Sequence, residues 1–269
     1  MSVLTDILAR KRARVEAAKK ELPQETLRGR VDRQSHSHRL LSALQHEGLN
    51  VIAEFKRKSP SKGIIRADVD ATSMSQSYEA GGAVAISVLT EEDYFDGSLA
   101  DLSAVKRIVR LPVLRKDFIF DEYQIVEAAA AGADAILLIV AALDDNSLSN
   151  LRRVAELEFG LDALVEVHDE AEMERAAQAG AKIIGVNNRN LHTFEVSLET
   201  SIKLASLAPE GTTLVSESGL TTSEDLIRLS EVGYRGFLIG ETLMRAEKPE
   251  EALRNLLNGS RSVLQGSVS

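Results

Sequence analysis

Short apolar runs alternate with longer amphipathic segments along most of the chain. Four segments repeat one pattern, in which an Ala/Glu-rich run is followed by a glycine and then by a short apolar run. Their glycines are Gly82, Gly132, Gly180 and Gly233, at steps of 50, 48 and 53 residues. A glycine just past a helix can adopt the left-handed conformation that closes the last turn, and a strand can follow at once. With the apolar runs between these units, the pattern predicts eight strands near residues 51–55, 83–88, 113–116, 135–140, 162–167, 183–186, 213–216 and 236–239.

Helical patterns separate the predicted strands, so the units are β-α throughout and the sheet should be parallel. The run 135–140 is apolar on both faces, as in a parallel strand that is covered by helices. Eight such units with an even quasi-repeat favour a closed (β/α)8 TIM barrel of the α/β class. An open doubly wound sheet is the alternative. Such a sheet normally carries a glycine-rich phosphate loop, but no two glycines of this chain stand two apart, as G-x-G-x-x-G requires.

Residues 1–269 are predicted to form one domain. Within it, residues 1–50 form an N-terminal helical extension, residues 51–258 form the barrel, and residues 259–269 form a disordered tail. Leu4, Ile7 and Leu8 share one stripe of the first predicted helix, and basic residues dominate the rest of it. We interpret this helix as a cap with a solvated face, and the alternative is a lid over one mouth of the barrel.

Composition narrows the range of functions. The chain has 32 Lys and Arg against 41 Asp and Glu, and the net charge of −9 argues against a nucleic-acid partner. It has no cysteine, which excludes disulfides, thiolate metal sites and a cysteine nucleophile. The longest apolar run, 135–143, is far shorter than the roughly 20 residues of a membrane span, and the N-terminus lacks a secretory signal. We therefore expect a cytoplasmic protein with no membrane partner, and the motifs indicate neither a metal nor a cofactor.

Charged side chains follow the predicted strands at the end where barrels carry their active sites. Glu54 and Lys56 alternate with Phe55, so both face the barrel interior if Phe55 packs against the helices. Lys116 and Glu166 end two further strands. Two lysines and two carboxylates at one rim suit acid–base catalysis. We expect the clustered ammonium groups to lower one another's pKa and burial to raise the pKa of the carboxylates.

Polar and glycine-containing turns follow the last three predicted strands. Glycines allow a phosphate to approach backbone N–H groups, and the loops after the last two strands of a barrel frequently form a phosphate site. After the sixth strand, the fork of Arg189 could clamp a carboxylate or a phosphate, although a solvated turn fits equally well there. These turns contain Asn187, Arg189, Glu217, Ser218, Gly219, Gly240 and Glu241. They predict a phosphorylated anionic small molecule as the ligand.

The sequence closely resembles the indole-3-glycerol phosphate synthase family of tryptophan biosynthesis, from about residue 4 to residue 258. The motifs that carry the resemblance are IAEFKRKSPSKG (52–63), LTEEDYFDGS (89–98), LRKDF (114–118), LVEVH (164–168), IGVNNRNL (184–191) and SESG (216–219). The resemblance implies a cofactor-free carboxy-lyase on a TIM barrel. Its substrate would be 1-(2-carboxyphenylamino)-1-deoxyribulose 5-phosphate, and its products indole-3-glycerol phosphate, carbon dioxide and water.

The resemblance also implies a role for each site residue. Lys116 would be the general acid on the ketone oxygen, and Glu166 and Lys56 would serve the later proton transfers and the dehydration, in an order that is left open. The remaining roles fall into four groups: Glu54, Asn187 and Glu217 shape and polarise the site; Lys56, Ser59 and Arg189 hold anionic groups; Ser218, Gly219, Gly240 and the backbone N–H of Glu241 form a phosphate cradle; Pro60, Phe95, Phe118 and Leu138 form an apolar pocket for the aromatic ring.

Other functions are left open at this point. A phosphoribosyl isomerase barrel has the same phosphate loops, but its phosphoribosylanthranilate type expects a cysteine on the first strand, where this chain has none. A Schiff-base aldolase is disfavoured because the sixth strand ends in asparagine instead of lysine. A non-catalytic barrel would bind a phosphometabolite without turnover. We expect a monomer, with weak association with other enzymes of the pathway as an alternative.

Overall fold

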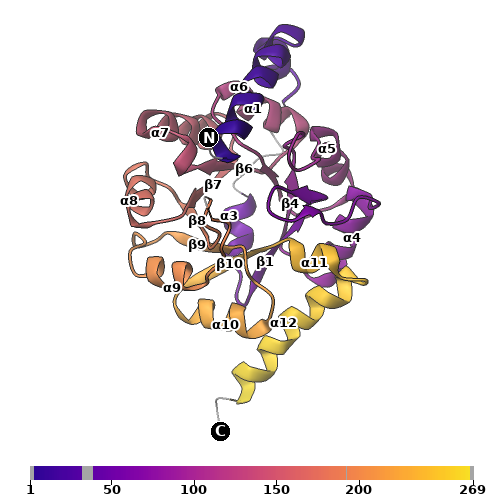
Figure 1. The fold of residues 1–269 in the computed structure, drawn as a ribbon, viewed down its shortest axis with the longest axis vertical. Helices are drawn as coiled ribbons and strands as arrows, with labels where there is room; N and C mark the ends of the chain where they lie inside the picture. Colours follow the sequence, from indigo (N-terminus) through magenta and orange to yellow (C-terminus); the bar gives the residue numbers. More distant parts are fainter. Residues whose placement is uncertain (1–2, 32–38, 192, 267–269) are drawn as a thin grey trace.

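A closed barrel of eight parallel strands forms the centre of the protein (Figure 1), in a computed structural model that describes residues 3–31, 39–191 and 193–266. Each strand pairs with the next around the ring, and the last pairs with the first. The strands are β1 (Asn50–Phe55), β4 (Ala85–Leu89), β5 (Val113–Lys116), β6 (Ala135–Ile139), β7 (Asp162–Val167), β8 (Ile183–Asn187), β9 (Thr213–Glu217) and β10 (Tyr234–Ile239). The predicted (β/α)8 barrel is confirmed, and the strand ends lie within two residues of the predicted ones. A short hairpin of β2 (Lys58–Ser59) and β3 (Gly63–Ile64) follows β1 and was not predicted.

Helices surround the barrel, and local sequence explains where many of them begin and end. Asp70 and Asp121 accept hydrogen bonds from backbone N–H groups at the starts of two helices. Gly82 and Gly132 end the same helices with φ of 99° and 90°, which a residue with a side chain rarely adopts. The outer helices are α4 (Ala71–Gly81), α5 (Leu99–Ile108), α6 (Glu122–Ala131), α7 (Asp145–Arg153), α8 (Glu170–Gln178), α9 (Glu199–Ala205), α10 (Ser223–Glu231), α11 (Glu241–Arg245) and α12 (Pro249–Gly266), with a 3₁₀ turn at Val140–Ala142 and a π turn at Val154–Glu158.

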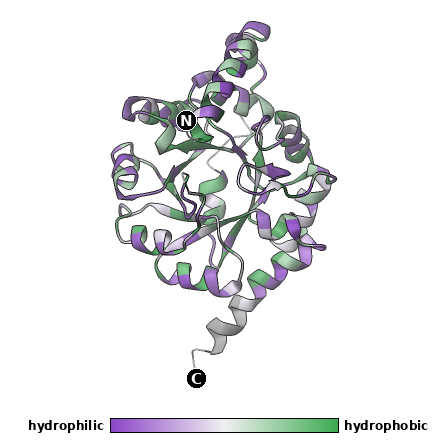
Figure 2. Cartoon of the chain, viewed as in Figure 1, coloured by the Kyte–Doolittle hydropathy of each residue, from purple (hydrophilic) through white to green (hydrophobic). Residues whose placement is uncertain are grey.

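Apolar side chains form two layers of core. Figure 2 shows the hydrophobic colours gathered on the strands and on the helix faces that meet them, with hydrophilic colours outside. Phe55 belongs to the outer layer, between the strands and the helices, so the condition for Glu54 to face the barrel interior is met. Ile52, Leu114 and Leu164 belong to the inner layer, which fills the barrel. Because both faces of the strands are buried, a charged side chain inside the barrel can lie only near its ends.

The N-terminal extension divides between the two ends of the barrel. Its helices are α1 (Val3–Glu21), α2 (Gln24–Arg28) and α3 (Arg39–Leu44). Leu40 and Leu44 of α3 are fully buried in the inner core layer and close the amino ends of the strands. Leu4 and Ile7 of α1 instead line a cavity at the carboxyl ends, so α1 covers that mouth as the lid alternative expects.

At the other end of the chain, α12 extends to Gly266, and its backbone is helical through much of the segment predicted to be a disordered tail. No proline interrupts that segment. Within the part of the chain that the structure describes, no helix is both long enough and apolar enough to cross a membrane.

Candidate active site

A cavity of about 770 Å³ opens at the carboxyl ends of the strands. That volume is within the usual range for small-molecule sites. Fifteen of the sixteen site residues predicted from the sequence line it. They are Glu54, Lys56, Ser59, Pro60, Phe95, Lys116, Phe118, Glu166, Asn187, Arg189, Glu217, Ser218, Gly219, Gly240 and Glu241. The parallel topology brings these residues together because every strand ends at the same rim.

Leu138 is the exception, and its assignment to the aromatic pocket is wrong. Leu138 is fully buried in the outer core layer, between the barrel and the helices. Its neighbours Leu137 and Ile139 point to the opposite face of β6 and line the cavity. Strand alternation could have identified them, since Ile139 lies beside Glu166 in the β6–β7 register and must share its face.

Lys116 lies at the centre of the charged residues of the cavity. Its Nζ is 2.7 Å from Oε2 of Glu217 and 3.4 Å from Oε2 of Glu166. Both carboxylate side chains are almost fully buried. A second pair lies on β1 and just beyond it, where Nζ of Lys56 is 2.5 Å from Oε1 of Glu54. The cavity floor therefore carries ammonium groups in direct contact with carboxylates.

The pKa of Lys116 is raised, whereas the clustered lysines were expected to lower it. Burial by itself would lower the pKa of Lys116, but Glu217, Glu166 and Glu54 outweigh burial and raise it well above its usual range. Burial would raise the pKa of Glu166, but Lys116 and His168 lower it. Burial raises the pKa of Glu217 to about 7, against the pull of Lys116. Lys116 is thus protonated in the free protein at neutral pH.

Glu217 has one oxygen that the protein leaves free. Its Oε2 binds Lys116, whereas its buried Oε1 has no hydrogen-bond partner among the described residues. Gly185 of β8 faces this oxygen so closely that a Cβ at that position would overlap it. A buried carboxylate oxygen without a partner is costly in its charged form, which agrees with the raised pKa of Glu217.

The glycine turns after β9 and β10 form a second, less charged part of the cavity. Ser218 and Gly219 have φ of 68° and 80°, so two consecutive residues are in the left-handed region. Oδ1 of Asn187 accepts hydrogen bonds from the hydroxyl of Ser218 at 2.9 Å and from the backbone N–H of Arg189 at 3.0 Å. Gly240 precedes α11, whose start has no side-chain cap. Backbone N–H groups in such turns can bind an anion.

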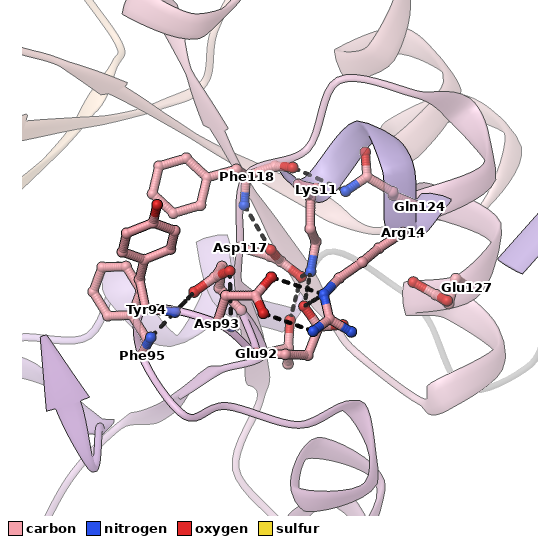
Figure 3. Close-up of polar contacts among 12 residues, drawn as sticks. Lys11, Arg14, Glu92, Asp93, Tyr94, Phe95, Asp117, Phe118, Gln124 and Glu127 are labelled. Atoms are coloured by element: carbon pink, nitrogen blue, oxygen red, sulfur yellow. Dashed lines mark hydrogen bonds and ion pairs between the residues drawn. The ribbon is translucent and has the colours of Figure 1, made fainter. Parts of the chain in front are cut away.

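Helix α1 is attached over the cavity by buried and exposed ion pairs (Figure 3). Nζ of Lys11 lies 2.8 Å from carboxylate oxygens of both Glu92 and Asp117, and the Lys11 side chain is only 3% exposed. Next to it, Arg14 donates two hydrogen bonds to Asp93, at 2.8 and 2.7 Å. The basic residues of this helix were interpreted as a solvated face. For Lys11 that interpretation is wrong, because its buried side chain reaches from the helix to carboxylates of the barrel.

The partners of α1 also position the aromatic wall of the cavity. Asp117 accepts a hydrogen bond from the backbone N–H of Phe118 at 2.8 Å. Glu91 accepts hydrogen bonds from the backbone N–H groups of Tyr94 and Phe95 at 2.7 and 3.1 Å. The rings of Phe95 and Phe118 then face the cavity with their centroids 6.1 Å apart. Together with Leu4 and Ile7 of α1, they make one side of the cavity apolar.

The cavity can thus bind an anionic group, an aromatic ring and a proton-accepting group at three adjoining places. Across residues 3–31, 39–191 and 193–266, no group of three His, Cys, Asp or Glu side chains is arranged to hold a metal ion.

Comparisons with known proteins agree with this arrangement. The model of the indole-3-glycerol phosphate synthase family matches residues 4–256. A protein of Salinibacter ruber named indole-3-glycerol phosphate synthase is 46% identical over 260 residues, covering 95% of each chain. One of Koribacter versatilis with the same name is 53% identical over 210 residues, covering 78% of this chain and 80% of that one.

Solved structures at low identity share the fold. The 3-hexulose-6-phosphate synthase of Salmonella typhimurium is 17% identical with a TM-score of 0.64, covering 80% of this chain and 99% of that chain. The thiamine phosphate pyrophosphorylase of Pyrococcus furiosus is 17% identical with a TM-score of 0.60, covering 86% of this chain and 100% of that chain. The match to the family model and the identity to these relatives show that the chain belongs to the indole-3-glycerol phosphate synthase family.

Proposed function

We propose that this cavity converts 1-(2-carboxyphenylamino)-1-deoxyribulose 5-phosphate into indole-3-glycerol phosphate, carbon dioxide and water, with Lys116 as the general acid. The observation that carries the proposal is the buried contact of the Lys116 ammonium with Glu166 and Glu217, between an aromatic wall and two glycine turns. We further propose that the protein works as a cytoplasmic monomer.

The substrate would bind with its three groups at the three parts of the cavity. Its phosphate would lie against the turns at Ser218, Gly219, Gly240 and the backbone N–H of Glu241. The aromatic ring would pack against Phe95, Phe118 and Pro60, under the apolar face of α1. Its carboxylate would lie near the cations Lys56 and Arg189, with Ser59 as a further hydrogen-bond donor. This orientation places the ketone carbon over the charged floor, where Lys116 can reach its oxygen.

The chemistry then needs proton transfers that these side chains can perform. As the ring carbon attacks the ketone, Lys116 gives its proton to the developing alkoxide. Loss of carbon dioxide returns the C–C bond electrons to the ring and restores its aromaticity. Dehydration then protonates the new hydroxyl and removes one proton from the neighbouring carbon. Glu166 and Lys56 would serve that step, while Glu54, Asn187 and Glu217 hold the charges in place.

The test is turnover by the purified protein and by a lysine variant. The protein should produce the indole absorbance and release carbon dioxide when it is mixed with the substrate. Lys116→Ala should lower kcat by about 100-fold or more, the usual scale for a lost general acid, with the fold intact. Lys203→Ala is the control, because Lys203 is exposed and its ion pair is with Glu170, on the outside of the barrel. Turnover at the wild-type rate by Lys116→Ala would remove Lys116 from the mechanism.

A further inference from the structure

His168 follows β7 and lies between Glu166 and the outer surface of the barrel. Its Nδ1 is 2.9 Å from Oε2 of Glu172 on α8, and that oxygen also accepts a hydrogen bond from the His168 backbone N–H at 2.8 Å. On the other side of the ring, the buried Nε2 is 3.3 Å from Oε1 of Glu166, within ion-pair distance, and makes no hydrogen bond to any described residue. The imidazole therefore bridges two carboxylates, one inside the cavity and one outside it.

Glu166 uses its two oxygens for two different partners. Oε1 faces His168, and Oε2 faces Nζ of Lys116 at 3.4 Å. The contacts form one continuous line, from Lys116 through Glu166 and His168 to Glu172. No residue of this line after Glu166 is needed to bind the substrate, because His168 and Glu172 do not line the active-site cavity.

The outer end of this line reaches solvent. His168 lines a separate surface pocket of about 520 Å³, and its side chain and that of Glu172 are 12% and 15% exposed. The charged groups around this pocket are Asp169, Glu170, Glu199 and Lys203. The pocket is lined by the turn after β7, the start of α8 and residues 197–204, and none of its lining residues lines the active-site cavity.

The proposed reaction needs such a route because it consumes a proton. Ring closure takes one proton for the ketone oxygen, dehydration takes a second for the leaving hydroxyl, and one proton returns from the carbon next to the nitrogen. The substrate carboxylate is already ionised when it leaves as carbon dioxide, so decarboxylation neither takes up nor releases a proton. Each turnover therefore draws one proton from solvent.

We propose that His168 and Glu172 are positioning residues that carry this proton from solvent to Glu166, from which Lys116 is recharged. The inference rests on the proposed function. Each step moves one proton inward: the His168 imidazolium gives the proton on Nε2 to Glu166, and Glu166 passes it to the neutral amine of Lys116. The ring still holds its Nδ1 proton toward Glu172. It therefore has to turn about its Cβ–Cγ bond, away from Glu166, before the vacated Nε2 takes a new proton from solvent, through Glu172 or water. Burial lowers the pKa of His168, but Glu166 and Glu172 outweigh it and raise the pKa to about 10, so the ring is loaded at neutral pH.

Matched glutamine variants test the route. His168→Gln and Glu172→Gln should each lower kcat by about 10-fold, less than the loss of a group that acts directly, with KM changed by less than about twofold. The solvent deuterium isotope effect on kcat should rise in both, because proton delivery becomes slower than the chemistry. Glu170→Gln is the control. Glu170 lies on the same helix and lines the same pocket, but pairs with Lys203, so its variant should match the wild type.

Chemical rescue separates proton delivery from support of the fold. In His168→Ala, added imidazole should restore kcat in proportion to its concentration, and it should not accelerate the wild type. Wild-type kcat and isotope effect in both glutamine variants would overturn the proposal. A loss confined to KM or to the melting temperature would also overturn it, because it would indicate a structural role. If His168→Gln does not fold, Glu172→Gln decides, since its amide oxygen can still accept the same two hydrogen bonds.

The outcomes also distinguish this inference from the proposed function. If the wild-type protein does not convert the substrate, the proposed function fails. If the wild type is active, Glu166→Gln is inactive, and His168→Gln and Glu172→Gln match the wild type, only the proton route fails.

Discussion

The ammonium group of Lys11 lies 2.8 Å from the carboxylate of Asp117, and both side chains are almost completely buried. Lys11 comes from the helix that covers the cavity, whereas Asp117 directly follows the proposed general acid on β5. The Asp117 carboxylate also accepts a hydrogen bond from the Thr90 hydroxyl at 2.6 Å and forms an ion pair with Arg115 at 3.0 Å. This contact joins the cover of the cavity to the strand end that carries its chemistry.

Lys11→Met should loosen the cover while leaving the charged floor in place. Losing one partner of a buried ion pair costs about 3–5 kcal/mol, and because Arg115 still faces Asp117 we expect a decrease of about 1–3 kcal/mol in the free energy of unfolding. KM should rise by about 10-fold with a smaller effect on kcat, because the variant weakens the aromatic wall that binds the ring. Denaturant unfolding and steady-state kinetics measure the two effects.

Lys20→Met is the control for Lys11→Met. Lys20 is an exposed lysine of the same helix, so the same substitution there should change neither quantity. If Lys11→Met kept the wild-type KM, the ion pair would have no part in closing the cavity.

Gly240→Ala should affect both binding and catalysis. A Cβ at Gly240 would overlap the Oε1 atom of Glu54, which pairs with Lys56. The substitution would therefore displace a carboxylate of the charged floor as well as narrow the phosphate turn. We expect KM to rise and kcat to fall, each by about 10-fold or more, the scale of a lost polar contact at a reacting centre. Steady-state kinetics with the intact substrate measures both.

Gly29→Ala is the corresponding control. A Cβ there would make ordinary contacts of 3.5 and 3.9 Å, with the backbone oxygens of Thr26 and Glu25. An effect of Gly240→Ala on KM alone would place the Glu54 carboxylate outside the catalytic step.

Glu217 should give activity and stability opposite pH dependences. Burial raises its pKa in the folded protein to about 7, above the usual value of 4.5. Since the folded state binds this proton more tightly than the unfolded state, its contribution to stability is present below pH 4.5 and is lost as the pH rises through 7. Activity should change in the other direction, because only the ionised carboxylate can hold the Lys116 ammonium in place.

Glu217→Gln tests both pH dependences. In the wild type, kcat/KM should fall as the pH decreases below about 7. The variant should lack this decrease and show only the decrease that protonation of the substrate phosphate causes, near pH 6. The free energy of unfolding of the wild type should decrease between pH 4.5 and 7 because of Glu217, and that of the variant should not show this decrease. If the wild-type limb persisted unchanged in Glu217→Gln, another group would control it.

The sequence by itself determined the barrel fold and which residues lie at the carboxyl ends of its strands. The repeat of glycine and apolar run is a local signal, because helix ends and strand alternation depend on neighbouring residues. Parallel topology then requires every strand to end at one rim, so residues as distant as Glu54 and Glu217 could be assigned to one site. Alternation also predicted that Phe55 and Glu54 point to opposite faces of the strand, whereas the structure shows that Phe55 is the one that packs against the helices.

Only the tertiary structure decided which charges touch. The direction of the pKa shifts of Lys116 and Glu166 depends on contacts of 2.7 and 3.4 Å between strands distant in the chain, which no spacing in the sequence encodes. The same holds for Lys11, whose partners lie just after β5 and in the loop after β4. It also holds for the division of the N-terminal extension between the two barrel ends. Leu138 was misplaced by one position, and on a strand one position is the difference between the cavity and the outer core layer.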